Sequence, residues 1–193
     1  MSQHEHNEDQ MLITRAKRGD GQAFESLVRK YQKPIYYLCH RMTGAHQSAD
    51  DLSQDTFIKA YLSLRTFNEG MNFFSWIRRI AVNSALNFLK KRKREKSLGD
   101  REMRVIDSSK VSSPEMPHDA LQKKQMEEKF KQALTELPDE QRVIFVLKVY
   151  ENQSYDQIAS MLKIPHGTVM SRLSRARQKL KNEMSEFLRG ERR

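Results

Sequence analysis

Apolar residues recur at helical spacing through most of the chain, and this pattern predicts an all-α fold. A first helix is expected over residues 10–18, with Gly19 as its C-cap. Asp20 is placed to cap a second helix, which Gly44 ends. The chain has seven Gly and five Pro in 193 residues, so few positions interrupt such helices.

Ser48 is predicted to cap a third helix, with Asp51 three residues on as in a capping box. A fourth helix is predicted over residues 73–96. Pro34 lies inside the second helical pattern, where a kink is expected. The third helix is expected to direct large apolar side chains toward the core: Leu52, Phe57, Ile58, Tyr61, Leu62 and Leu64.

Residues 97–117 separate two helical regions and are predicted to form a linker. The segment contains Pro114 and Pro117, several serines and no sustained apolar period. It divides the chain into two small helical domains, residues 11–96 and 118–190. In the second domain Ser154 is predicted to cap a helix, and Gln157 completes a capping box.

The net charge of +10 and the isoelectric point near 9.7 favour a polyanionic partner. Cations gather at the end of each half, as expected for two contacts with one long polyanion. Cys39 is the single cysteine, which fits a reducing cytoplasm. The sequence has no catalytic, metal-ligand or cofactor motif and no apolar stretch of membrane-spanning length. We therefore expect no enzyme activity, no metal, no cofactor and no direct membrane insertion.

The stretch "SYDQIASMLKIPHGTVMSRLSRARQKL" has the layout of a helix-turn-helix motif. A capped helix of eight residues, a short turn and a basic second helix follow one another at the expected lengths. Small polar side chains in the first turns of the second helix can reach base edges, and flanking cations can hold phosphates. The alternative is an ordinary helical hairpin with a solvated basic face.

The stretch "FFSWIRRIAVNSALNFLKKRKREK" at residues 73–96 combines aromatic rings with dense positive charge. On a helix its polar residues share one stripe: Arg79, Asn83, Asn87, Lys90 and Arg94. Rings lie beside the N-terminal end of that stripe: Phe67, Phe73, Phe74 and Trp76. Exposed rings can stack on unpaired bases, which favours a single strand as the ligand. The alternative is that the rings belong to the core.

At these two stretches, and at "GDGQAFESLVRKYQKPIYYLCHRM" and "SADDLSQDTFIKAYLSLRTF", the chain strongly resembles the sigma-70 family of bacterial RNA polymerase sigma factors. It resembles most the extracytoplasmic function (ECF) group, which keeps only regions 2 and 4. The resemblance covers about residues 12–188, with the motifs in the same order. It implies a cytoplasmic subunit that directs RNA polymerase to promoters and catalyses no reaction itself.

The resemblance implies that residues 49–61 dock on the β′ clamp helices of core RNA polymerase. The expected interface residues are Asp50, Asp51, Gln54 and Asp55. Three carboxylates within six residues of a basic domain suit a basic partner. The alternative is that these acids complement the helix dipole, which accounts for Asp50 and Asp51 better than for Asp55.

The resemblance also implies that residues 73–96 melt the −10 element and trap non-template bases. Ser63, Phe67 and Asn83 would line a pocket for one flipped base, and Trp76 would support the preceding loop. The side chains expected to hold the DNA backbone are Arg78, Arg79, Lys90 and Lys91. Asn87 of the polar stripe is a further candidate contact.

For the −35 element, the resemblance places four side chains at base edges: Met170, Ser171, Ser174 and Arg175. Three others are expected near phosphates: Thr168, Arg172 and Arg177. Relatives often carry a cation at the position of Met170 and a bulkier residue at that of Ser174. Arg175 is therefore the best candidate for base choice, through a bidentate contact.

The expected partners are core RNA polymerase, contacted at the β′ clamp helices and the β flap, promoter DNA and an anti-sigma factor. One rival interpretation is a helix-turn-helix repressor or activator that acts without polymerase. It gives the aromatic stretch no role and lacks an evident dimerisation or sensor segment. A second rival, a non-specific single-strand or RNA-binding protein, leaves the helix-turn-helix unused.

Overall fold

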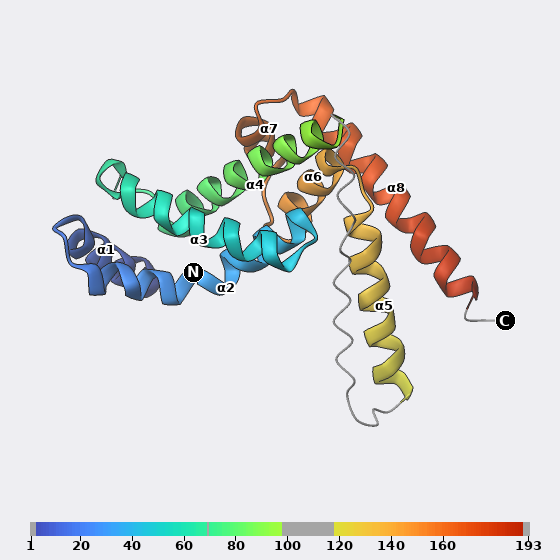
Figure 1. Cartoon of the computed structure of the whole chain (residues 1–193), viewed down its shortest axis with the longest axis horizontal. Coiled ribbons are helices and arrows are strands. Elements are labelled where there is room, and N and C mark those ends of the chain that lie inside the picture. The colour runs from blue at the N-terminus through green and yellow to red at the C-terminus, as the bar shows by residue number, and fades with distance from the viewer. Residues whose placement is uncertain (1–2, 69, 98–117, 191–193) are drawn as a thin grey trace. The chain divides into compact units, whose positions relative to one another are not determined.

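The computed structural model describes residues 3–68, 70–97 and 118–190, without the side chains at 3–6, 96–97, 118–123, 186, 188 and 190. Nearly all of the predicted linker therefore lies outside the described residues. The chain divides into two compact units, residues 1–105 and 106–193. The described part contains helices and no strand, which confirms the all-α prediction (Figure 1).

The first unit contains α1 (Gln3–Lys17), α2 (Gly21–Thr43), α3 (His46–Ser63), the 3-10 turn η1 (Leu64–Thr66) and α4 (Phe73–Ser97). The second unit contains α5 (His118–Thr135), α6 (Asp139–Val149), α7 (Tyr155–Leu162) and α8 (His166–Gly190). The first helix is longer than the predicted 10–18, because it begins seven residues earlier.

The boundaries of α2 follow the predicted capping signals. The Asp20 carboxylate accepts a hydrogen bond from the backbone N–H of Ala23 at 3.1 Å. That bond and a hydrogen bond from Arg15 lower the pKa of Asp20. Gly19 and Gly44 have φ of 94° and 75°, a conformation that glycine adopts without strain. The helix continues through Pro34 up to its end at Thr43.

The predicted start of α3 is wrong. The helix begins at His46 with Ala45 as its N-cap, and no side chain caps it, so Ser48 lies within the first turn. The buried face of α3 is built mostly from small residues: Ala49, Leu52, Ser53, Thr56, Phe57 and Ala60. These residues follow helical spacing and pack against α2 and α4.

Three residues predicted to be in the core instead lie on the outside of α3. Ile58 and Leu62 are 59% and 76% exposed, and Tyr61 is also exposed beside the ring of Phe24. The side of α3 that carries Ser53 and Thr56 is the buried one, because those small side chains allow close helix packing. The prediction was correct for Leu52, Phe57 and Leu64.

A buried carboxylate fastens α1 to α2. Asp9 is 2% exposed, and it accepts hydrogen bonds from Lys30 Nζ at 2.6 Å and from the hydroxyl of Tyr31. Buried charges are tolerated only when they are paired in this way. Apolar residues of the same two helices are buried as well, among them Ile13, Leu27 and Ile35.

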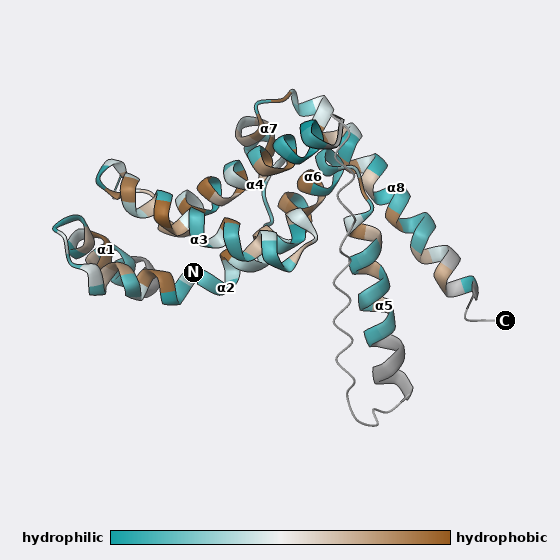
Figure 2. Cartoon of the chain, viewed as in Figure 1, coloured by the Kyte–Doolittle hydropathy of each residue, from teal (hydrophilic) through white to brown (hydrophobic). Residues whose placement is uncertain are grey.

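The second unit is organised around α6, whose residues 142–147 are all buried. Arg142 is buried too, and it donates to the carbonyl oxygen of Thr135 at 2.7 Å and to Asp139. The predicted capping box of α7 is present, with Ser154 and Gln157 hydrogen-bonded in both directions. Hydropathy mapped on the ribbon shows mixed polar and apolar faces along these helices (Figure 2).

Candidate nucleic-acid interface

The polar stripe predicted on α4 is exposed along its length. The opposite side of the helix is buried through Phe73, Ile77, Ala81, Ala85 and Leu89. The exposed stripe consists of Arg79, Asn83, Asn87, Lys90 and Arg94, and Lys91 is exposed next to it in sequence. An amide-bearing stripe that ends in cations can hydrogen-bond base edges and hold phosphates. Lys91 also lies 3.7 Å from Glu95, an exposed pair that contributes little to stability.

The aromatic cluster at the N-terminal end of α4 is turned largely into the core. Phe67 is 3% exposed and Phe73 is buried, so neither ring is available at the surface to stack on a base. Phe67 contacts the ring of Trp76 edge-on, with a centroid separation of 5.0 Å. Trp76 is half-buried and also touches Phe73. The core alternative therefore describes these rings as the structure has them.

Arg78 and Arg79 are adjacent in sequence but differ in surroundings. Arg79 is exposed on the polar stripe. Arg78 is half-buried, and its guanidinium lies 5.4 Å from the centroid of the Phe74 ring, which stacks on Tyr31. Arg78 therefore packs toward α2, as expected for a cation–π contact, instead of joining the stripe.

Ser63 lies at the end of α3, next to the N-terminal half of α4. Lys59 Nζ donates to the hydroxyl of Ser84 at 3.0 Å, and the Phe67–Trp76 contact follows further along. Ser63 lies between Lys59 and Phe67 in the sequence, and Ile80 lies between Trp76 and Ser84. Both residues are therefore located between these two contacts. Asn83 is exposed beside Ser84. Of the three residues predicted to form a base pocket, Asn83 is exposed, Ser63 is half-buried and the Phe67 ring is turned into the core.

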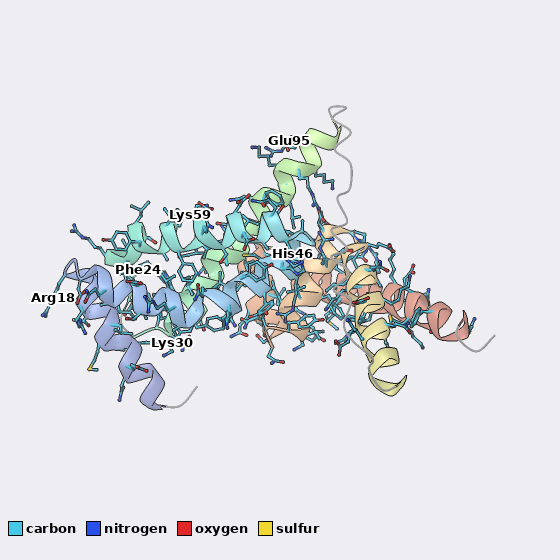
Figure 3. All side chains as sticks on the ribbon, turned by 60° about the horizontal axis from the view of Figure 1, so that its bottom comes forward. Arg18, Phe24, Lys30, His46, Lys59 and Glu95 are labelled. Carbon is cyan, nitrogen blue, oxygen red and sulfur yellow. The ribbon has the colours of Figure 1, made fainter. Side chains whose placement is uncertain are left out.

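The acidic residues on α3 form an exposed surface. Asp50, Asp51 and Gln54 are exposed, and Asp55 is half-buried in an ion pair with Lys59 at 2.6 Å (Lys59 is labelled in Figure 3). Ile58 and Leu62 continue the side of Asp51 and Asp55 at intervals of three and four residues. Neither residue was among the predicted docking residues, although this spacing places both beside the carboxylates and not opposite them.

The second helix of the helix-turn-helix, α8, has a buried and an exposed face. Its buried face consists of Val169, Leu173, Ala176 and Leu180. The predicted base-contacting side chains are all exposed: Met170, Ser171, Ser174 and Arg175. Arg177 is exposed too, and Thr168 is half-buried in the first turn. The geometry thus leaves the predicted recognition surface open to solvent.

Arg172 differs from the other predicted phosphate contacts. Its guanidinium lies 2.6 Å from the carboxylate of Glu140, and its side chain is largely covered. The pair joins α8 to the first turn of α6. Because the two residues are far apart in sequence, helical periodicity gives no sign of this contact.

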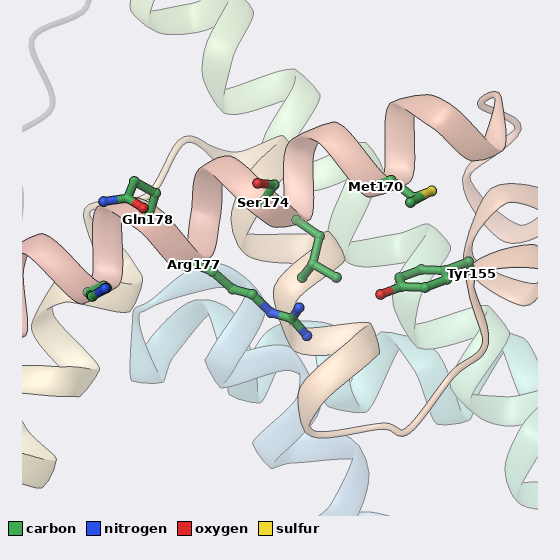
Figure 4. A pocket seen from close by; sticks show the side chains of 7 residues that line it. Tyr155, Met170, Ser174, Arg177 and Gln178 are labelled. Carbon is green, nitrogen blue, oxygen red and sulfur yellow. The ribbon is translucent and has the colours of Figure 1, made fainter.

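A hollow of about 330 Å³ lies between α7 and the exposed face of α8. Its lining residues are Tyr155, Met170, Leu173, Ser174, Arg177, Gln178 and Lys181. Figure 4 shows Arg177 reaching from α8 toward the side on which Tyr155 lies. Lys148 Nζ lies 4.9 Å from the centroid of the Tyr155 ring, which keeps this tyrosine beside positive charge. Tyr155, Gln178 and Lys181 were not among the predicted site residues.

The two units match two family descriptions in the order that the motifs suggested. Residues 27–95 match Sigma-70 region 2, and residues 127–180 match Sigma-70, region 4. The chain belongs to the sigma-70 family. Its function is that of an RNA polymerase sigma factor of the ECF type, a transcription initiation factor that binds core RNA polymerase and promoter DNA, and not that of a repressor acting alone.

Relatives of this sigma factor match over nearly their whole length. The RNA polymerase sigma-H factor of Pseudomonas aeruginosa is 36% identical over 187 residues, covering 94% of this chain and 96% of the relative. The ECF RNA polymerase sigma factor SigW of Bacillus subtilis is 33% identical over 179 residues, covering 91% and 96%. The ECF RNA polymerase sigma-E factor of Escherichia coli is 30% identical over 188 residues, covering 94% and 96%.

Solved structures of similar fold include the sigma factor RpoE of Bartonella quintana, in complex with the anti-sigma factor NepR. It is 26% identical, with a TM-score of 0.63, and the match covers 84% of this chain and 96% of that one. CnrH, solved in complex with the cytosolic domain of CnrY, shares the fold with a TM-score of 0.60 at 21% identity. Within the described residues of this sigma factor, no helix has the length and apolar character needed to cross a membrane.

Proposed function

We propose that this sigma factor works through three surfaces, on α3, on α4 and on α8. One observation carries the proposal: most of the predicted polar side chains of α4 and α8 are exposed, while the opposite faces of both helices are buried. Buried faces fix the two helices in their units, and exposed ones are available to DNA. The protein acts in the cytoplasm, beside core polymerase.

The α3 surface docks on the β′ clamp helices. Asp50, Asp51, Gln54 and Asp55 supply the polar contacts, as the family resemblance implies. We add Ile58 and Leu62, since large exposed apolar residues beside charged ones are typical of interface centres. The Lys59 partner of Asp55 lies at the edge of this surface and orients the carboxylate.

The α4 surface holds the opened −10 element. Asn83 and Asn87 hydrogen-bond unpaired bases, and Arg79, Lys90 and Lys91 hold the strand through its phosphates. Ser63 borders the site of the flipped base. Phe67 and Trp76 support the loop from its buried side. A base contacts the Phe67 ring only after that ring moves. Arg78 supports the loop from the side of Phe74.

The α8 surface reads the −35 element as a duplex. Arg175 chooses the base, with Met170, Ser171 and Ser174 beside it, and Thr168 and Arg177 lie near phosphates. We add Tyr155 and Lys181 as phosphate contacts, because they line the hollow with Arg177. Arg172 contributes less to DNA binding than the others, since Glu140 already holds it. The same unit docks on the β flap.

We also propose that an anti-sigma factor covers these surfaces when the protein is inactive. The Bartonella RpoE neighbour was solved with such a partner, and it resembles this chain over most of its length. This sigma factor carries both exposed cations and exposed apolar side chains. An anti-sigma factor can cover both kinds of surface.

Run-off transcription tests the proposal as a whole. The purified chain is added to purified core polymerase with a genomic promoter library, and start sites are mapped. We expect starts that share two sequence elements at a fixed separation, absent from reactions with core alone. If no start depends on the chain, the proposed function is wrong.

A further inference from the structure

The loop between η1 and α4, of which the structure describes residues 67–68 and 70–72, is held by α1 through side chains distant in sequence. Lys17 Nζ donates to the carbonyl oxygen of Phe67 at 2.8 Å, in a partly buried contact. Gln10 Nε2 donates to the carbonyl oxygen of Met71 at 3.4 Å. These two bonds reach both ends of the loop. Lys17 also lies 5.9 Å from the centroid of the Phe67 ring.

Gln10 and Lys17 are seven residues apart, so they lie on one face of α1, two turns from each other. Ile13 lies on the same face and is fully buried. The neighbouring face carries Asp9, which is bound to Lys30 and Tyr31 of α2. One side of α1 is therefore fixed to the unit and an adjacent side donates to the loop.

The same loop determines where α4 begins. The side chain of Asn72 accepts a hydrogen bond from the backbone N–H of Ser75 at 2.9 Å, as an N-cap does. Phe67 packs on Trp76 in the first turn of α4. Tyr31, which binds Asp9, also contacts the rings of Phe73 and Phe74. Movement of α1 is thus linked to the loop and to the first turn of the helix that carries Asn83.

We propose that α1 is the support of the 67–72 loop, and that Lys17 is a positioning residue for promoter opening. This inference rests on the proposed role of α4 in holding the −10 strand. An ammonium bound to a partly buried carbonyl oxygen is a strong hydrogen bond, so its loss frees the loop more than the loss of a surface charge does. Residues 27–95, which match region 2, do not include α1.

The test compares Lys17→Met with Arg18→Met in holoenzyme at saturating core polymerase. Both variants remove one positive charge from neighbouring residues, but the side chain of Arg18 is exposed at the end of α1 (Figure 3). Permanganate reactivity of −10 thymines reports opening, and −35 duplex binding and the melting temperature report the rest of the protein. We expect Lys17→Met to lower opening about tenfold, with −35 affinity unchanged. Lys17→Arg, which keeps a cationic donor, should restore most of the opening, and Arg18→Met should resemble the wild type.

Equal opening in Lys17→Met and Arg18→Met overturns the proposal. A loss of −35 affinity as large as the loss of opening also overturns it, because Lys17 would then act on folding in general. Asn83→Ala in the same assay separates this inference from the function on which it rests. If Asn83→Ala loses opening and Lys17→Met does not, only the support role is wrong. If Asn83→Ala opens normally, the assignment of α4 is wrong and the support role is overturned with it.

Discussion

The two DNA-facing helices, α4 and α8, have the same design but depend on different kinds of contact. Each buries one apolar face and exposes a polar, cationic one. Each also turns one predicted phosphate contact inward, Arg78 onto Phe74 and Arg172 onto Glu140. The helices differ at their N-termini. A locally capped helix-turn-helix leads into α8, whereas α4 follows a loop held by side chains 50 and 61 residues away.

This difference suggests a division of labour. Reading a duplex requires a rigid helix face, which the capped helix-turn-helix supplies together with the Arg172–Glu140 pair. Trapping an unpaired base requires a loop and a helix end in a fixed relation, which several elements must share. The first unit also carries the α3 surface with its exposed apolar residues, and the first prediction below concerns that surface.

The largest effect is expected from Leu62→Asp. Leu62 is the most exposed of the three large apolar residues on the outside of α3. The change should therefore leave the fold intact while placing a charge in the docking surface. Losing a central interface contact typically costs about 2 kcal/mol or more, so core polymerase affinity should fall roughly 30-fold or more. Fluorescence anisotropy of labelled sigma factor with core polymerase measures this.

Met11→Asp is the matched control for Leu62→Asp. Met11 is also a large exposed apolar residue, but it lies on α1 and not on α3. It should bind core polymerase like the wild type. If the two variants lose the same affinity, α3 has no special part in docking.

A smaller effect distinguishes the exposed cation from the inward one on α8. Arg177→Ala should reduce the slope of log affinity against log salt for −35 duplex binding by about one, because one phosphate contact is lost. Arg172→Ala should leave the slope nearly unchanged, since Glu140 holds that guanidinium. It should instead lower the free energy of unfolding by about 0.5 kcal/mol, as for a partly exposed ion pair. If both variants reduce the slope by the same amount, Arg172 leaves Glu140 when the protein binds DNA.

Local signals in the sequence predicted the second unit well. The capping box at Ser154 and the exposed face of α8 both follow from nearby residues. The pair of Arg172 and Glu140 joins separate helices, and periodicity cannot show it. The hollow beside Tyr155 likewise requires α7 and α8 to be packed together.

The first unit was harder to predict, and the errors have a common cause. Helix α3 carries large apolar residues on more than one side. Periodicity alone therefore did not show that Ser53 and Thr56 face the core while Leu62 faces the solvent. For the rings of Phe67 and Phe73 the sequence left both a surface and a core position open, and packing on Trp76 places them in the core. Lys17 and Gln10 carry no local sign of their bonds to the loop. The residue roles at both DNA surfaces stay predictions.

The most direct test of the account asks whether opening and −35 reading can be lost separately. Asn83→Ala and Arg175→Ala are compared in holoenzyme on a promoter with variant −35 elements. Asn83→Ala should lose most of the permanganate reactivity at the −10 thymines while keeping −35 affinity. Arg175→Ala should lose roughly 1–3 kcal/mol of discrimination among −35 variants while still opening DNA to which it is bound. If each variant loses both activities to the same extent, the two units do not divide the work and the central claim is wrong.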